Sequence, residues 1–345
     1  MRILITGCNK AQCTYDFYLQ QQLRVAMCQY SLPRALRDMG HTVDMRPVII
    51  GENLDQYDEV FVFLHNPAGF AGYVYNALWA ISAAPNCILS FDDWQTDSIF
   101  DSLIALDTSE KLFRKFIIDS HANIPDNIES YGESMLSAIE KIKSRSNRLV
   151  FPAFSGGDLS LLLGSRAWPE ELLFSYNPNP YHLNRQSSVQ LFPEPKQRVF
   201  NFAGLVQNKT KKWLAAQQVS TTAWPLKLYG SRKDGQDRVV ESEMIDIYSA
   251  QWGILMPGYF HAGSGWWRAR PLQIADVCSI LIGSPKEMML YYKDAYLSNL
   301  RAIDIVDLSD SALTEIAVAQ RDAIYRNHPL DKEVTRNELN AVLKA

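Results

Sequence analysis

The sequence lacks the features that would place it in a membrane, in an oxidising compartment or around a structural metal. No stretch of the 345 residues approaches the roughly 20 consecutive apolar residues that a membrane-spanning helix requires. Residues 1–15 contain no charged start followed by a long apolar run, so we expect no secretory leader, no membrane partner and a cytoplasmic protein. The five cysteines form no CxxC pair and have no histidine at zinc spacing, which predicts free thiols and no structural metal.

Strong positive charge and repetition are missing as well. The formal net charge is −4, and the excess of acid lies in residues 1–170, whereas residues 171–345 are slightly basic. This balance counts against a tight binder of duplex nucleic acid, although a basic stripe can lie on an acidic protein. No internal repeat or low-complexity tract is present, so a solenoid is not expected. The length favours two domains, and 47% hydrophobic residues suffice for two cores.

Short apolar runs alternate with helical segments over the first half of the chain. Such alternation predicts a parallel sheet covered by helices on both faces. A segment rich in Pro and Asn, residues 177–197, interrupts the pattern and is interpreted as an interdomain linker. The expected strands of the first half are 2–6, 42–50, 59–64, 87–91, 148–151 and 172–175.

A second series of strands and helices follows the linker. We expect strands at 199–202, 226–229, 252–256, 279–282 and 302–306. The fold class is therefore α/β, with two Rossmann-like domains that face a central cleft. The expected domains are 1–180 and 181–330, and a C-terminal helix in 331–345 is expected to cross back onto the first domain. Ligands of such sheets bind at the carboxyl ends of the strands.

Two aspartates follow the fourth expected strand, in the segment Ser-Phe-Asp-Asp-Trp-Gln-Thr-Asp that begins at Ser90. A carboxylate at a strand end can act as a general base toward an acceptor hydroxyl. The alternative is that the aspartates cap the next helix. For Asp92 the two interpretations are equally favoured, whereas Asp93 favours the base. A metal site that holds Mg²⁺ or Mn²⁺ is a third interpretation, disfavoured by the two-domain pattern.

Candidate phosphate-binding residues gather in the second half. A turn and a lysine-rich helix start follow one strand, and glycines and arginines follow another. Backbone N–H groups at helix starts and nearby cations bind phosphate oxygens, while glycines let a loop approach them closely. Solvent-exposed lysines and a structural His261 are the simpler alternatives. The predicted donor-binding residues are Gly7, Gly204, Gln207, Lys209, Lys211, Tyr229, Gly230, Gly258, His261, Gly263, Arg268, Arg270 and Gln273.

These segments, taken in order, resemble the phage DNA glycosyltransferases, and among them the DNA β-glucosyltransferases of T-even phages. The Phe91-Asp92-Asp93 triplet is similar to that family's Phe-Thr-Asp, whose Asp is the catalytic base and matches Asp93. Gln207 and Lys211 fall on two arginine positions, and Gly230 matches a glycine turn. Arg270-Pro-Leu-Gln273 lies on Arg-Val-Trp-Glu, in which the Arg contacts phosphate and the Glu holds the ribose.

The resemblance implies the GT-B fold, with an acceptor-binding first domain and a nucleotide-sugar-binding second domain. It also implies an inverting transfer of glucose, or of arabinose as in related phage enzymes, from a UDP-sugar to a hydroxylated cytosine in duplex DNA. The target base would be flipped out of the duplex. Gln207 and Gln273 replace charged residues of the family pattern, which leaves the sugar open. A phage enzyme would act as a monomer in the cytoplasm of an infected bacterium.

Two other functions remain open at this point. The acidic first half favours a GT-B enzyme that acts on a cell-surface glycan or a small acceptor, whereas the basic run 141–148 favours DNA. A nucleotide-binding protein without activity is the third, and the aspartate pair counts against it. In both enzyme interpretations the two domains must approach each other to join base and sugar and to exclude water.

Overall fold

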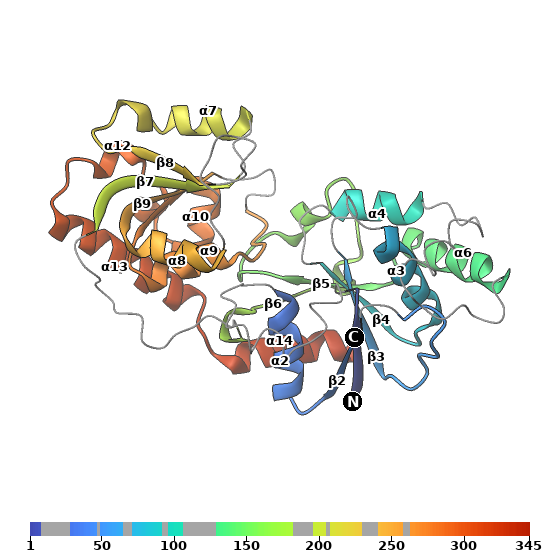
Figure 1. Ribbon diagram of the computed structural model, residues 1–345. Helices are drawn as coiled ribbons and strands as arrows, with labels where there is room; N and C mark the ends of the chain where they lie inside the picture. Colours follow the sequence, from blue (N-terminus) through green and yellow to red (C-terminus); the bar gives the residue numbers. More distant parts are fainter. Residues whose placement is uncertain are drawn as a thin grey trace.

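Two parallel β-sheets, each covered by helices, form two lobes (Figure 1). The computed structural model describes residues 1–7, 28–46, 49–64, 71–91, 96–105, 129–181, 196–204, 208–229, 241–257 and 263–345. Among the helices of these ranges, none is long and apolar enough to cross a membrane.

The first lobe is built on a six-stranded sheet with the order β2-β1-β3-β4-β5-β6, and every neighbouring pair is parallel. Its strands read as nearly continuous apolar runs because both faces of the sheet are covered. They are β1 (Arg2–Thr6), β2 (Thr42–Arg46), β3 (Glu59–Leu64), β4 (Cys87–Phe91), β5 (Arg148–Pro152) and β6 (Leu173–Tyr176). Its helices are α2 (Cys28–Asp38), α3 (Ala71–Ala83), α4 (Thr96–Ile104) and α6 (Glu129–Lys143), with short 3-10 turns η2 (Leu159–Leu162), η3 (Glu170–Leu172) and η4 (Asn179–Tyr181).

Alternate residues of each central strand enter different cores, as the two-residue period of a strand requires. Leu4 of β1 packs on the face that carries α3, α4 and α6. Ile3 and Ile5 pack on the opposite face, together with Leu36 of α2 and Leu339 of the C-terminal helix. The first sheet thus has two apolar layers.

The second lobe contains a four-stranded parallel sheet with the order β10-β9-β7-β8. Its strands are β7 (Gln197–Ala203), β8 (Leu226–Tyr229), β9 (Gln251–Met256) and β10 (Ile280–Gly283). Its helices are α7 (Asn208–Ala216), α8 (Glu241–Ser249), α9 (Ala269–Asp276), α10 (Pro285–Tyr292), α11 (Ala295–Ser298), α12 (Ala302–Ile305) and α13 (Asp310–Asn327), with a 3-10 turn η5 (Val219–Thr221).

The strand predicted over residues 302–306 is wrong, because the segment forms the short helix α12. Ala302 and Ile305, three residues apart, are the two buried positions, which is helical spacing. Asp304 accepts hydrogen bonds from the backbone and the side chain of Arg301 at the start of the turn. An apolar run this short does not distinguish a strand from a helix.

The C-terminal helix α14 (Lys332–Lys344) packs against β6 and α2 of the first lobe, as Figure 1 shows. Its Arg336 and Lys332 donate to Asp38, the last residue of α2, and the hydroxyl of Tyr181 donates to the same carboxylate. The Tyr181 hydrogen bond, followed by that of Arg336, lowers the pKa of Asp38 to about 2. Asp38 therefore joins three segments of the chain through one charge.

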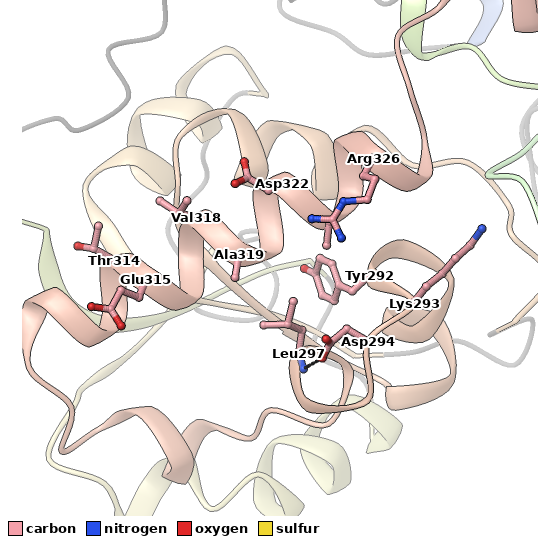
Figure 2. Close-up of a pocket in the computed structure, with 11 residues that line it drawn as sticks. Tyr292, Lys293, Asp294, Leu297, Thr314, Glu315, Val318, Ala319, Asp322 and Arg326 are labelled. Carbon is pink, nitrogen blue, oxygen red and sulfur yellow. Dashed lines mark hydrogen bonds between the residues drawn. The ribbon is translucent and has the colours of Figure 1, made fainter.

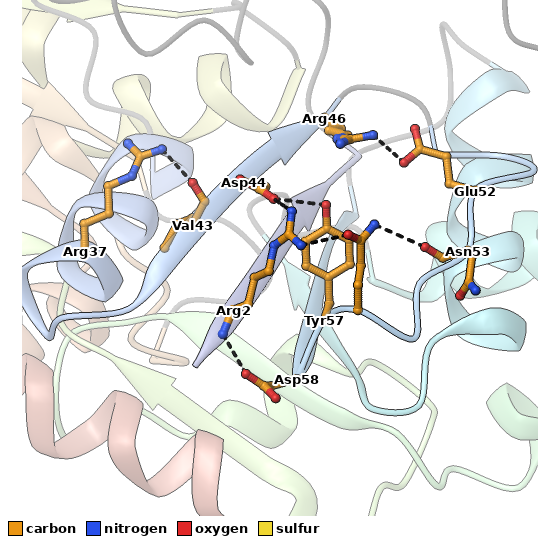
Figure 3. A network of polar contacts seen from close by, with 10 residues as sticks. Arg2, Arg37, Val43, Asp44, Arg46, Glu52, Asn53, Tyr57 and Asp58 are labelled. Atoms are coloured by element: carbon orange, nitrogen blue, oxygen red, sulfur yellow. Dashed lines mark hydrogen bonds and ion pairs between the residues drawn. The ribbon is translucent and has the colours of Figure 1, made fainter.

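A polar network ties together the amino ends of the first three strands (Figure 3). Asp44 of β2 accepts from the guanidinium of Arg2 at 3.0 Å and from the hydroxyl of Tyr57 at 3.0 Å. The backbone N–H of Arg2 donates to Asp58. This network lies at the edge opposite to the carboxyl ends of the strands, so its role is to hold the sheet.

Candidate functional site

The carboxyl ends of the strands are where the predicted site residues should gather, and nine of them lie within the described residues. These are Gly7, Gly204, Lys209, Lys211, Tyr229, Gly263, Arg268, Arg270 and Gln273. Asp92, Asp93, Gln207, Gly230, Gly258 and His261 lie outside the described residues.

Both flanks of the aspartate pair are anchored in the first lobe. Phe91, the last residue of β4, is buried, and its ring lies 5.1 Å from that of Phe151 and 5.4 Å from that of Phe100. On the other side, Thr96 begins α4 and its hydroxyl donates to the carbonyl of Leu162. The described residues on both sides of the aspartate pair are therefore fixed within the first lobe.

Gly7 and Gly204 end the first strand of each lobe. Gly7 has φ +85°, and a Cβ on it would lie 2.3 Å from the carbonyl oxygen of Phe63, so β1 and β3 need a glycine there. Gly204 has φ +151° and donates its N–H to the carbonyl of Tyr229. The hydroxyl of Tyr229 accepts a hydrogen bond from the buried Gln251, within the lobe.

Lys209 and Lys211 lie in the first turn of α7, which follows β7 at the carboxyl edge. Both are exposed, and neither forms an ion pair with a described residue. Two lysines at a helix start that have no carboxylate partner among the described residues are available to an anion.

Arg268 and Arg270 differ although only one residue separates them. The side chain of Arg268 is 11% exposed; its guanidinium lies 5.4 Å from the Trp266 ring centroid and 3.8 Å from the carboxylate of Glu287. Arg270, in the first turn of α9, is half-buried and makes no ion pair within the described part of the chain. Gln273, one turn further, is buried. Arg270 is thus the arginine whose charge is available, whereas Glu287 already balances Arg268.

Sequence reasoning missed Glu287, a buried carboxylate at the start of α10. Its Oε1 accepts from the hydroxyl of Tyr291 at 2.8 Å, and its Oε2 has no hydrogen-bond partner. A buried carboxylate requires a compensating charge, and Arg268 is the cation that approaches it. The only signal in the sequence was a charged pair, Lys286 and Glu287, directly after an apolar strand.

Segments of the two lobes are joined by backbone hydrogen bonds next to this site. The N–H of Phe154 donates to the carbonyl of Gly265, that of Asp158 to Gly263, and that of Trp267 to Pro152. Ala153 and Trp266 form an antiparallel bridge. We call residues 152–158 and 263–267 the interlobe junction. We call residues 257–268, which include Gly258, Gly263 and Gly265, the glycine-rich loop. Its second half, residues 263–267, is therefore fixed to the first lobe, and any closure of the lobes has to pivot there.

Aromatic side chains cover the interlobe junction. The ring of Phe154 makes edge contacts at 4.8 Å with Tyr291 and with His328. The indole N–H of Trp267 donates to the side chain of the buried Asn179. Burial lowers the pKa of His328 to about 4, so this histidine is neutral at neutral pH. The junction is therefore apolar in its interior and closed by polar contacts.

A pocket of about 560 Å³ lies elsewhere in the second lobe, between α13 and the α10–α11 segment (Figure 2). Tyr292, Leu297 and Ala319 form part of its wall, and Lys293 lies at its edge. None of the predicted site residues lines it. Within the described ranges, no group of three or more His, Cys, Asp or Glu side chains could hold a metal ion.

Comparison with known proteins identifies the fold. No protein-family model matches the chain, and no curated protein matches its sequence. The solved structure of the T4 phage β-glucosyltransferase with UDP and Mn²⁺ aligns over 100% of both chains with 13% identity and a TM-score of 0.60. The same T4 enzyme with its UDP-glucose substrate aligns over 100% of both chains with 12% identity and a TM-score of 0.58. The predicted GT-B fold with two Rossmann-like domains is confirmed.

Proposed function

We propose that this protein is a UDP-sugar-dependent glycosyltransferase that modifies cytosine in phage duplex DNA. The observation that supports it most is the full-length agreement in fold with the T4 phage enzyme, a β-glucosyltransferase described as DNA-modifying. Lys209, Lys211 and Arg270, which form no ion pair with a described residue, support a nucleotide donor, because they lie at the starts of α7 and α9 on the carboxyl edge of the second sheet. The sugar is glucose or arabinose, and the acceptor is 5-hydroxymethyl- or 5-hydroxycytosine.

The donor occupies the second lobe in this proposal. Arg270 neutralises the diphosphate with help from Lys211, and Gln273 hydrogen-bonds the ribose hydroxyls. Arg268 serves to hold the start of α9, since Glu287 already balances its charge. In this proposal a divalent metal binds only together with the diphosphate, as Mn²⁺ is present with UDP in the T4 structure. The described residues supply no ligand cluster for it.

The reaction is a single displacement with inversion. Asp93 removes the proton from the acceptor hydroxyl as the oxygen attacks the anomeric carbon of the sugar. The bond from that carbon to the β-phosphate oxygen breaks, and UDP leaves with the electron pair. Arg270 stabilises the negative charge that develops on the diphosphate. The acceptor base reaches the site after flipping out of the duplex.

A glycan or a small molecule is the second candidate acceptor. The acidic composition of residues 1–170 favours it, because the acceptor meets the first lobe in GT-B enzymes. The two acceptors differ in salt dependence: duplex DNA affinity falls linearly with the logarithm of the salt concentration, with a slope set by the phosphates contacted.

Binding of a hydroxymethylated duplex at several salt concentrations, with and without UDP, tests the proposal for a monomeric enzyme. We expect micromolar or tighter affinity with a clear salt slope. A chain that binds UDP but shows no DNA affinity at any salt concentration would point to the glycan acceptor. A chain that binds neither would refute both.

A further inference from the structure

A lysine at the start of α10 lies against the glycine-rich loop. Lys286 is the second residue of α10, which follows β10 at the carboxyl edge of the second sheet. A Cβ on Gly263 would lie 2.8 Å from the Cε of Lys286, so the missing side chain at residue 263 leaves the space that the lysine stem occupies. Gly263 also has φ +98°, which glycine adopts without strain.

The stem of Lys286 therefore rests on a fixed surface. The carbonyl of Gly263 accepts a hydrogen bond from the N–H of Asp158 across the interlobe junction. A long side chain that packs along its stem keeps its charged end in solvent. The amine of Lys286 is thus held close to Gly263, on the side where the two lobes meet.

The charge of Lys286 has no partner within the described part of the chain. The side chain is exposed and forms no ion pair there. Its neighbour Glu287 is turned into the lobe, where it accepts from Tyr291 and approaches Arg268. The carboxylate of Glu287 is therefore engaged with Tyr291 and Arg268 and does not pair with Lys286.

A departing diphosphate at this edge favours a further cation beside Arg270 and Lys211. A nucleoside diphosphate carries more than one negative charge at neutral pH, and its charge increases as the sugar leaves. Glu287 balances Arg268, so Arg270 is the arginine at the start of α9 that forms no ion pair with a described residue. One guanidinium matches only part of the diphosphate charge.

We propose that Lys286 binds the phosphate of the donor that carries the sugar, and that it acts together with Arg270. This inference rests on the proposed function, because it assumes a nucleoside diphosphate donor. Lys286 contacts substrate in this arrangement and stabilises the departing diphosphate. Glu287 and Arg268 position the starts of α10 and α9, which carry Lys286 and Arg270 respectively.

Calorimetry with UDP, UMP and uridine tests the assignment on the full chain with Lys286→Gln and Lys286→Arg. A hydrogen bond between charged groups contributes about tenfold or more to affinity, so we expect Lys286→Gln to weaken UDP binding about tenfold. Binding of UMP should change less than threefold, roughly within error, and uridine binding should not change. Lys286→Arg should retain most of the UDP affinity.

Lys293→Gln is the matched control. Lys293 is also exposed, lies at the opposite end of α10 about 10 Å away along the helix, and forms no ion pair within the described part of the chain. This variant should bind UDP as the unmodified protein does. Thermal unfolding of each variant verifies that the fold is intact, since both lysines are exposed.

Unchanged UDP affinity in Lys286→Gln, while the unmodified protein binds UDP, would overturn the assignment of Lys286. If that variant also binds duplex DNA more weakly, with a salt slope reduced by about one, the lysine would be assigned to a DNA phosphate instead. If the unmodified protein binds no UDP, the proposed function itself fails, and the inference fails with it.

Discussion

Replacing Gly157 by alanine should open the interlobe junction without unfolding either lobe. A Cβ on Gly157 would lie 2.1 Å from the carbonyl oxygen of Ser264 and 2.5 Å from the Cα of Gly265. Both of these atoms belong to the backbone, so no side chain can move away. The two segments must separate by about 1 Å to restore ordinary contact, which is the kind of strain that overpacking causes.

The cost follows from the bonds on either side of Gly157. The hydrogen bonds from Phe154 to Gly265 and from Asp158 to Gly263 would lengthen beyond useful range. Each contributes about 1 kcal/mol net, and overpacking adds about 1 kcal/mol or more. A total of about 3 kcal/mol corresponds to roughly 100-fold faster hydrogen exchange at the junction amides, because local opening determines that exchange.

The assay is hydrogen exchange of the amides of Phe154, Asp158 and Trp267, with Gly156→Ala as the control. Gly156 has φ +89° and no atom within 4 Å of its would-be Cβ, so alanine there costs about 1 kcal/mol of backbone strain and no contact. Exchange at the junction should be fast in Gly157→Ala and nearly unchanged in Gly156→Ala. Equal protection in both variants would refute the interlobe junction.

Three further predictions concern catalysis and the C-terminal helix. Asp93→Asn should retain UDP binding but lower the transfer rate by at least about 100-fold, measured by steady-state kinetics; near-normal turnover would remove Asp93 from the mechanism. Arg270→Ala should weaken UDP binding and slow transfer, whereas Gln273→Ala should raise KM for the donor more than it lowers kcat; unchanged UDP affinity in both variants, measured by calorimetry, would contradict these roles. The lowered pKa of Asp38, about 2 against an ordinary 3.8, stabilises the fold above pH 4, and this stabilisation is lost as the pH falls through 2. Asp38→Asn should therefore remove about 1 kcal/mol of stability at pH 7 and flatten the acid limb of denaturant unfolding measured against pH, and an unaltered pH profile would show that Asp38 does not hold α14.

The parallel sheets could be predicted because buried strands read as apolar runs between turn residues. The strand predicted over residues 59–64 matches β3 as the structure has it. The segment 302–306 has the same apolar character but is too short for periodicity to decide, and tertiary packing made it a helix.

Pairings between distant segments could not be predicted in the same way. Glycines at 157 and 265 were visible, but their contact depends on how the two lobes meet. The orientation of Glu287 toward Arg268 likewise depends on the packing of α10 against the start of α9. The residues of the segment alone do not distinguish Arg268 from Arg270; the family resemblance favours Arg270, and the buried carboxylate of Glu287 supplies the physical reason.

Sugar transfer to DNA is the central claim, and mass spectrometry of nucleosides tests it most directly. Duplex DNA that contains 5-hydroxymethylcytosine or 5-hydroxycytosine is incubated with the protein and either UDP-glucose or UDP-arabinose, then digested. We predict a nucleoside heavier by one sugar residue with one of these donors, and none with Asp93→Asn. Unmodified nucleosides with every donor, from a protein that binds UDP-sugar, would contradict a DNA acceptor.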